Sequence, residues 1–168
     1  MCFLRAPSYP DFLAAAFLVS ACLALLLIDA EFQLLPDAIT LSGIAAGIAL
    51  SFFSASRTPL SAVLGAAVGA GGLFAVAFLY EKIAGQEGMG LGDVKMLGMI
   101  GAFLGPSGVV VTVLLSSVAG SAVGLGLMAA RRGSMKMALP FGIFLSLGAV
   151  AALFFGEPLM ATYRGLFR

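Results

Sequence analysis

Residues 60–80 read LSAVLGAAVGAGGLFAVAFLY, a continuous apolar run without Asp, Glu, Lys or Arg. A helix needs about 20 such residues to cross the hydrocarbon core of a bilayer. Lipid offers no hydrogen-bond partners, so a spanning segment must satisfy its own backbone groups, as a helix does. The stretch therefore predicts a transmembrane helix.

The rest of the chain has the same character. Of its 168 residues, 61% are hydrophobic and 10% are charged, whereas soluble domains carry about 25% charged residues. Its charges and prolines divide it into apolar segments at roughly 11–29, 38–54, 60–80, 94–105, 108–130 and 138–156. The fourth is short and stops before Pro106, so it either crosses a thinned region or sits inside the bundle. We expect an all-α polytopic membrane protein of about six transmembrane helices, forming a single domain over residues 1–168.

Glycines recur at spacings that suit close helix packing. The pairs are Gly43 and Gly47, Gly65 and Gly69, and Gly120 and Gly124, while Gly98, Gly101 and Gly105 share one face of the short segment. In lipid, faces of small residues let helix backbones approach one another closely. Packing is therefore the expected role of nearly all 22 glycines.

The composition excludes several classes of function. The chain has no histidine, which removes Ser-His-Asp and Cys-His catalysis and HExxH zinc sites. Cys2 and Cys22 form neither a CxxC pair nor a disulfide framework, so we expect no metal and no cofactor. A net charge of +1 without a basic stripe argues against nucleic acid. The apolar run continues past Cys22, which favours a retained helix over a cleaved signal peptide.

The loops predict an orientation. Arg131, Arg132 and Lys136 lie between the fifth and sixth predicted spans, which places that loop in the cytoplasm by the positive-inside rule. Two crossings separate residue 29 from residue 93, so both positions lie at one membrane face in either orientation.

Two acids lie at membrane depth. Asp29 ends an apolar run, and Asp93 opens the fourth segment within Gly90-Leu91-Gly92-Asp93. Ionisable groups there are costly and suggest function. Structural interpretations remain open, because Asp29 could be a polar helix end and Asp93 a helix N-cap.

The other acids near these two have simpler interpretations. Asp37 follows Pro36 and fits the N-cap of the second span. Glu31, Glu81 and Glu87 fit solvated loop charges.

Two carboxyls held together offer a specific chemistry. They share one proton, because neighbouring like charges cannot both ionise cheaply. The ionised member then takes a proton from water while the protonated member polarises a carbonyl. This reaction hydrolyses peptides without a metal or histidine, and the glycines beside Asp93 allow a substrate backbone to come close. The alternatives are a small cation or proton transporter using the same aspartates, or a purely structural membrane protein.

Three stretches resemble the bacterial prepilin peptidases, the type IV leader peptidase family of GxGD membrane aspartic proteases. They are IDAEFQLLPD at 28–37, EGMGLGDVK at 87–95 and LPFG at 139–142. The resemblance implies that Asp29 and Asp93 are the catalytic pair, with Asp37 outside it. It also implies an active site at the cytoplasmic face of the bacterial inner membrane.

The resemblance implies a substrate as well. It would be a type IV prepilin or a type II secretion pseudopilin, with a short basic leader, a glycine before the cut and then an apolar helix. The expected partners are this substrate helix and the lipid bilayer, and the oligomeric state stays open. Longer family members carry a cytoplasmic domain with paired CxxC motifs associated with N-methylation, which this sequence lacks, so methyltransferase activity is not expected here.

The residues expected to bind substrate or support the pair are Gly90, Gly92, Lys95, Asp37 and Glu87. Lys95 lies two residues after Asp93, where its cation would orient the substrate or stabilise the charged form of Asp93. The alternative for Lys95 is snorkelling to the lipid headgroups.

Overall fold

The computed structural model describes residues 8–85, 90–129 and 140–166, and every regular element in these ranges is an α-helix. The helices are α1 (Tyr9–Phe32), α2 (Asp37–Ser51), α3 (Pro59–Ala84), α4 (Leu91–Ala129) and α5 (Phe141–Leu166). The prediction of an all-α protein is confirmed. Three stretches, Tyr9–Phe32, Pro59–Ile83 and Leu91–Ala129, are long and apolar enough to cross a membrane, and two shorter helices are also apolar. The chain is a multi-pass membrane protein.

Local sequence explains where the helices begin and end. The side chain of Thr58 accepts a hydrogen bond of 3.2 Å from the Ser61 amide and caps α3. Gly85 ends α3 in the left-handed conformation with φ 66°, which glycine adopts without steric cost. Asp37 departs from the prediction: Pro36 occupies the N-cap of α2, and Asp37 is the first helical residue without a side-chain cap bond. The N-cap interpretation of Asp37 is therefore wrong.

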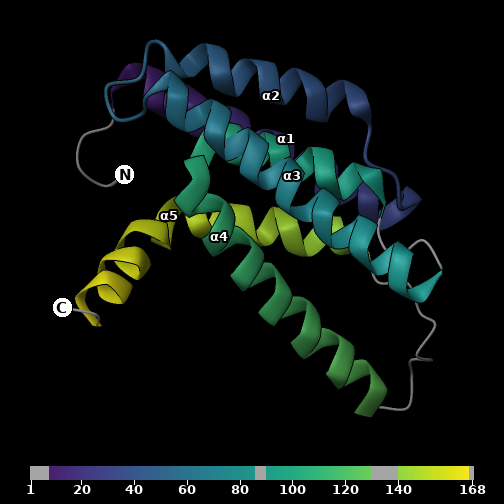
Figure 1. Cartoon of the computed structure of the whole chain (residues 1–168). Helices are drawn as coiled ribbons and strands as arrows, with labels where there is room; N and C mark the ends of the chain where they lie inside the picture. The colour runs from purple at the N-terminus through teal and green to yellow at the C-terminus, as the bar shows by residue number, and fades with distance from the viewer. Residues whose placement is uncertain (1–7, 86–89, 130–139, 167–168) are drawn as a thin grey trace.

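Helix α4 contains a break at Gly105, whose φ of 73° and ψ of 179° are not helical. Pro106 follows directly, and its ring and missing N–H prevent continuation of the preceding helix. The predicted fourth and fifth spans are therefore the two halves of α4, residues 91–104 and 106–129. Figure 1 shows the second half running away from the other helices.

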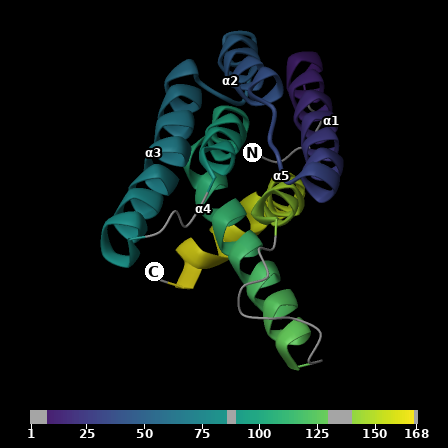
Figure 2. The same cartoon turned by 90° about the vertical axis from the view of Figure 1, so that its right-hand side faces the viewer.

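The first half of α4 lies inside the bundle. Figure 2 shows α1, α2 and α3 in an arc around it, and α4 contacts all four other helices. Met96, Leu97, Met99 and Ile100 are buried with at most 1% of their surface exposed. Of the two possibilities that the sequence left for the short segment, the structure supports burial within the protein.

Glycines set the distance between α3 and the first half of α4. Gly98 faces Ala70, Gly101 faces Gly65, and Gly105 faces Ser61. A methyl group on Gly65 would lie 2.8 Å from the Gly105 Cα and closer still to the Gly101 carbonyl oxygen. The two backbones thus touch where the sequence predicted a packing face.

The other crossings of α4 use small residues in the same way. A methyl group on Gly47 of α2 would lie 2.9 Å from the Ala102 Cβ, and one on Gly148 of α5 would lie 2.8 Å from the Thr112 carbonyl oxygen. The Ser116 hydroxyl donates to the Phe144 carbonyl at 2.8 Å across the α4–α5 contact. Helix α4 is therefore held tightly on three sides.

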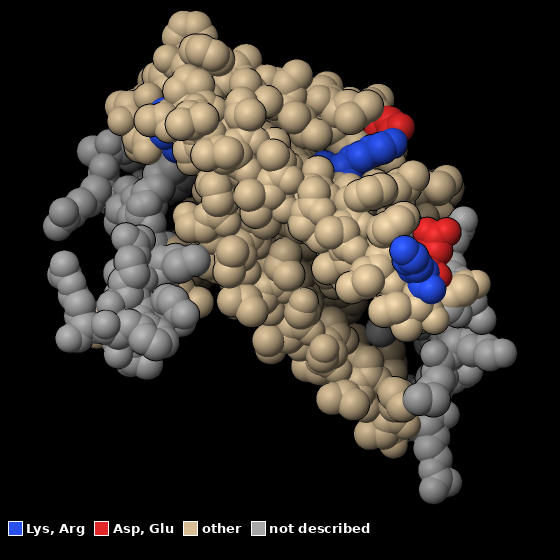
Figure 3. All heavy atoms as spheres, in the orientation of Figure 1, with Lys and Arg blue, Asp and Glu red and all other residues tan. Residues whose placement is uncertain are grey.

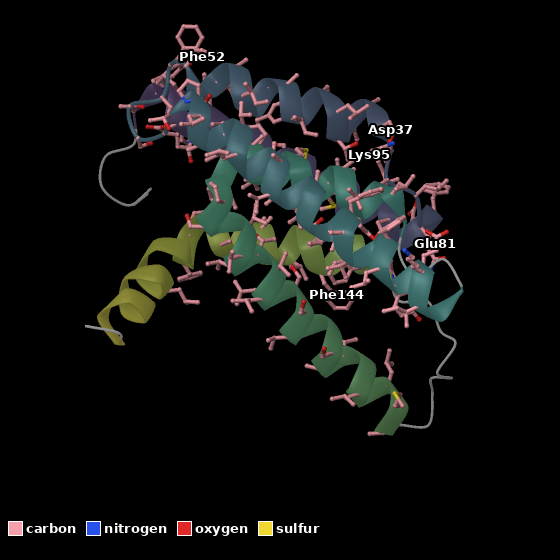
Figure 4. The ribbon with its side chains drawn as sticks, viewed as in Figure 1. Asp37, Phe52, Glu81, Lys95 and Phe144 are labelled. Atoms are coloured by element: carbon pink, nitrogen blue, oxygen red, sulfur yellow. The ribbon has the colours of Figure 1, made fainter. Side chains whose placement is uncertain are left out.

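A polar cluster lies at the end of the bundle marked by Phe52 in Figure 4. Arg57 donates through Nη1 to the carbonyl of Phe103, near the break at which helical bonding stops. Asp11 is buried, accepts a hydrogen bond of 2.6 Å from the Ser8 hydroxyl and another from Ser54, and attracts Arg57 electrostatically. Burial lowers the pKa of Arg57, and the charge of Asp11 opposes that change. On the face in Figure 3, the coloured charged side chains lie toward the two ends, with other residues between them.

Adding one methyl group to the α3–α4 contact should destabilise the protein. We expect Gly65→Ala to lower the free energy of unfolding by about 1–3 kcal/mol, the usual cost of overpacking, because the new Cβ meets backbone rather than a flexible side chain. Unfolding by denaturing detergent measures the change. Gly71→Ala is the control on the same helix, where a Cβ meets nothing within 4 Å. Equal stability of the two variants would contradict the packing argument.

Candidate active site

Asp29 lies in the last turn of α1, with 5% of its surface exposed. Its Oδ2 accepts a hydrogen bond of 3.2 Å from the backbone amide of Ile143, and the amide of Gly142 also bonds this carboxyl. These amides belong to the first turn of α5, where N–H groups have no partner within their own helix. The Asp29 carboxyl therefore supplies hydrogen-bond acceptors for the first N–H groups of α5, and these groups fix the orientation of the carboxyl.

Gly142 gives Asp29 the space that this contact requires. A methyl group on Gly142 would lie 2.6 Å from Oδ2 and 3.1 Å from Cγ of Asp29. A Cβ essentially never lies 2.6 Å from another heavy atom, so either the carboxyl or α5 would have to move. The small size of Gly142 thus keeps the helix start against the carboxyl.

Asp93 comes from the opposite side of the site, in the first turn of α4. It is half-buried, and its amide donates to the Gly90 carbonyl at 3.2 Å. Asp29 and Asp93 lie close enough for their charges to repel each other. The structure thus places the two aspartates that the sequence singled out at the same end of the bundle, within electrostatic range of each other. Two carboxyls that come close enough to share a proton can activate water.

The two glycines of the GxGD motif have different surroundings. A methyl group on Gly90 would meet only the Gly92 nitrogen, at 3.9 Å, so the space beside Gly90 is open. A methyl group on Gly92 would lie 2.9 Å from the Cβ of Leu35. The backbone that leads to Asp93 is therefore open at Gly90 and packed against Leu35 at Gly92.

Lys95 and Asp37 form an ion pair at this end of the protein. The Lys95 Nζ lies 2.7 Å from both carboxylate oxygens of Asp37, and Figure 4 shows the two side chains pointing toward each other. The pair joins the start of α2 to the first half of α4. Its exposed fractions are 34% for Lys95 and 57% for Asp37. Lys95 therefore holds Asp37, a partner that the sequence did not indicate for it.

The remaining predicted residues are placed as follows. Glu31 and Glu81 are exposed, and Figure 4 shows Glu81 at the same end as Lys95 and Asp37. Glu87 lies outside the described residues. Within the described ranges, no three His, Cys, Asp or Glu side chains gather in a group that could hold a metal ion.

Three residues at the candidate site are not among the site residues named from the sequence: Leu35, Gly142 and Ile143. Leu35 and Gly142 nevertheless lie in two of the stretches that carry the family resemblance. Ile143 contributes its backbone N–H, which no side-chain pattern reveals. Gly142 has a signal in Pro140-Phe141-Gly142 ahead of an apolar run, since proline marks helix starts. Leu35 resembles any other apolar residue beside a helix end.

The ion pair between Lys95 and Asp37 should stabilise the fold slightly. Because both side chains are partly solvated, we expect a coupling energy of about 0.2–1 kcal/mol. A double-mutant cycle of Asp37→Asn and Lys95→Met, followed by detergent unfolding, measures it. Lys82→Met is the control at the end of α3, and its combination with Asp37→Asn should be additive. Additivity of the Asp37 and Lys95 changes themselves would show that the pair contributes nothing.

Comparison with known proteins gives a consistent result. The profile of the type IV leader peptidase family matches residues 16–125. A prepilin leader peptidase/N-methyltransferase of Pseudomonas putida is 42% identical over 140 residues, which cover 83% of this chain and 49% of the relative. The protein with the same name from Aeromonas hydrophila is 34% identical over 151 residues, covering 90% of this chain and 52% of the relative. The chain spans about half the length of these curated relatives, and no solved structure matches it.

Proposed function

This chain belongs to the type IV leader peptidase family, and on that premise we propose that it is a membrane aspartic endopeptidase. Its substrate is a type IV prepilin or pseudopilin, from which it removes the leader peptide. The observation that carries this proposal is that Asp29 and Asp93 lie at one end of the bundle within electrostatic range of each other, with Asp29 held by the first turn of α5.

Peptide hydrolysis by this pair follows from ordinary carboxyl chemistry. The ionised carboxyl takes a proton from a water molecule, and the water oxygen attacks the carbonyl carbon of the scissile bond. The protonated carboxyl donates its hydrogen to the carbonyl oxygen, which stabilises the tetrahedral intermediate. The carbon–nitrogen bond then breaks as the carboxyl that took the proton from water gives it to the leaving nitrogen. A hydroxyl of the intermediate returns its proton to the other carboxylate as the new carbonyl forms, which restores the pair with one shared proton.

Rigid placement of Asp29 supports this mechanism. Reaction within a bound complex is fast when the reacting groups already have the correct geometry. The amides of Gly142 and Ile143 hold one side of the carboxyl. Asp93 is carried by the first half of α4, most of which is buried among the other helices. Both carboxyls are thus mounted on rigid helices.

The proposed site faces the cytoplasm, in the inner membrane of a bacterium. Arg131, Arg132 and Lys136 precede, in the sequence, the first turn of α5 that bonds Asp29. The positive-inside rule therefore favours the cytoplasm for this end of the protein. A prepilin helix would lie among the apolar helices while its leader junction reaches the aspartates. The proposal covers the peptidase reaction, and the methyltransferase activity in the relatives' names stays outside it.

Removing either carboxyl should abolish cleavage. We expect Asp29→Asn and Asp93→Asn each to lower kcat for prepilin cleavage by at least about 10²-fold, the contribution of a positioned acid or base. Cleavage of a purified prepilin in detergent, followed by gel shift, measures this. Glu31→Gln, two residues from Asp29 and exposed, is the control and should cleave normally. Normal cleavage by either aspartate variant would refute the catalytic pair. If the protein were instead a cation or proton transporter built on the same aspartates, the wild type itself would cleave no prepilin.

Moving Asp29 without removing it should also reduce activity. In Gly142→Ala the new methyl group forces Asp29 or α5 out of place, and displacements near 1 Å cost up to about 10²-fold. We expect a fall in kcat of about 10- to 100-fold with the fold retained. Gly165→Ala on the same helix meets nothing within 4 Å and serves as the control. Wild-type kcat in Gly142→Ala would show that the contact with α5 does not position Asp29.

A further inference from the structure

The connection between α1 and α2 reverses the chain directly beside Asp29. Gln33 has φ 51° and ψ 36°, the left-handed conformation, and its amide donates to the Asp29 carbonyl at 3.0 Å. Leu34 then points outward, with 68% of its surface exposed, whereas Leu35 is half-buried. Pro36 follows and restricts Leu35 to an extended backbone. The reversal thus directs one leucine to the lipid or solvent and the other toward the site.

The Leu35 side chain fills the space between the segments that carry the two aspartates. A methyl group on Gly92, next to Asp93, would lie 2.9 Å from the Leu35 Cβ and 3.3 Å from its Cδ1. A methyl group on Gly142 would lie 3.3 Å from the Leu35 Cδ2 and 2.6 Å from the Asp29 Oδ2. Leu35 therefore lies beside both glycines. Its Cδ2 methyl group and the Asp29 carboxyl lie next to the same side of Gly142.

We propose that Leu35 is a specificity-determining residue, which sets the upper size limit for the substrate side chain on the carbonyl side of the scissile bond. The inference rests on the proposed peptidase function. That carbonyl must approach both carboxyls, which brings the residue bearing it against Leu35. Glycine fits because it adds no side chain, and even a methyl group must occupy volume that Leu35 already fills.

Leu35 can exclude a side chain because its segment is held at both ends. On one side the Gln33 amide is bonded to the Asp29 carbonyl. On the other, Pro36 caps α2, and Asp37 is paired with Lys95 at 2.7 Å. A substrate methyl group would have to displace this short connection as well as the leucine. A substrate with alanine before the scissile bond would therefore bind less favourably than one with glycine.

Shortening Leu35 should relax the size limit. The substrates are a purified prepilin with glycine before the scissile bond and the same prepilin with alanine there, assayed on the full chain in detergent. We expect Leu35→Ala to lower the ratio of kcat/KM for glycine over alanine by at least about tenfold, the discrimination that one methyl group provides in a packed site. Leu34→Ala, at the exposed neighbouring position, should keep the wild-type ratio.

Two outcomes would overturn the inference. If Leu35→Ala slows both substrates by the same factor, Leu35 only packs the site. If Leu35→Ala fails to fold, Leu35→Val, which keeps most of the side chain, replaces it. The size limit requires Leu35→Val to lower the ratio of kcat/KM for glycine over alanine, and an unchanged ratio refutes it. A wild-type chain that cleaves no prepilin overturns the proposed function itself, whereas cleavage with an unchanged ratio in the Leu35 variants overturns this inference alone.

Discussion

The hydrogen bond from the Ile143 amide to Asp29 joins the end of α1 to the start of α5, 114 residues apart in the chain. A helix start in a membrane protein needs acceptors for its first N–H groups, because lipid provides none. A membrane-edge carboxylate needs donors for the same reason. The carboxyl of Asp29 and the first amides of α5 satisfy each other, so one contact both joins the two helices and fixes the orientation of this carboxyl. Gly142 makes the arrangement possible by leaving room beside the carboxyl.

The second constraint is the central position of the first half of α4. Hydrophobic driving force between helices is weak in lipid, so close van der Waals contact must hold them together. Gly65 and Gly101 let the α3 and α4 backbones touch, and Gly47 brings α2 against the same half of α4. A short helix fully surrounded by protein carries Asp93 at its exposed end. The position of that aspartate therefore depends on packing along the whole buried half.

The polar side chains lie in two groups, one at each end of the protein, and the two groups have different partners. At one end Arg57 and Asp11 serve the break in α4, where a carbonyl and a buried charge find partners. At the other end lie Asp29 and Asp93, with the ion pair of Lys95 and Asp37 nearby. In the first group, Arg57 gives a hydrogen-bond donor to a carbonyl that the break in α4 leaves without a helical partner. The second group places two carboxyls within electrostatic range of each other, the arrangement on which the proposed peptidase reaction depends.

The sequence by itself determined the helical class, the break before Pro106 and the shared end of Asp29 and Asp93, because run length, proline chemistry and the number of crossings are properties of the linear chain. It assigned Asp37 to the N-cap of α2, a position that Pro36 occupies in the folded protein, and it did not reveal the ion pair of Asp37 with Lys95 at 2.7 Å. Leu35 and the amide of Ile143 became part of the site through tertiary structure alone. An apolar side chain and a backbone N–H carry no local signature, and their role depends on which distant helix end they meet.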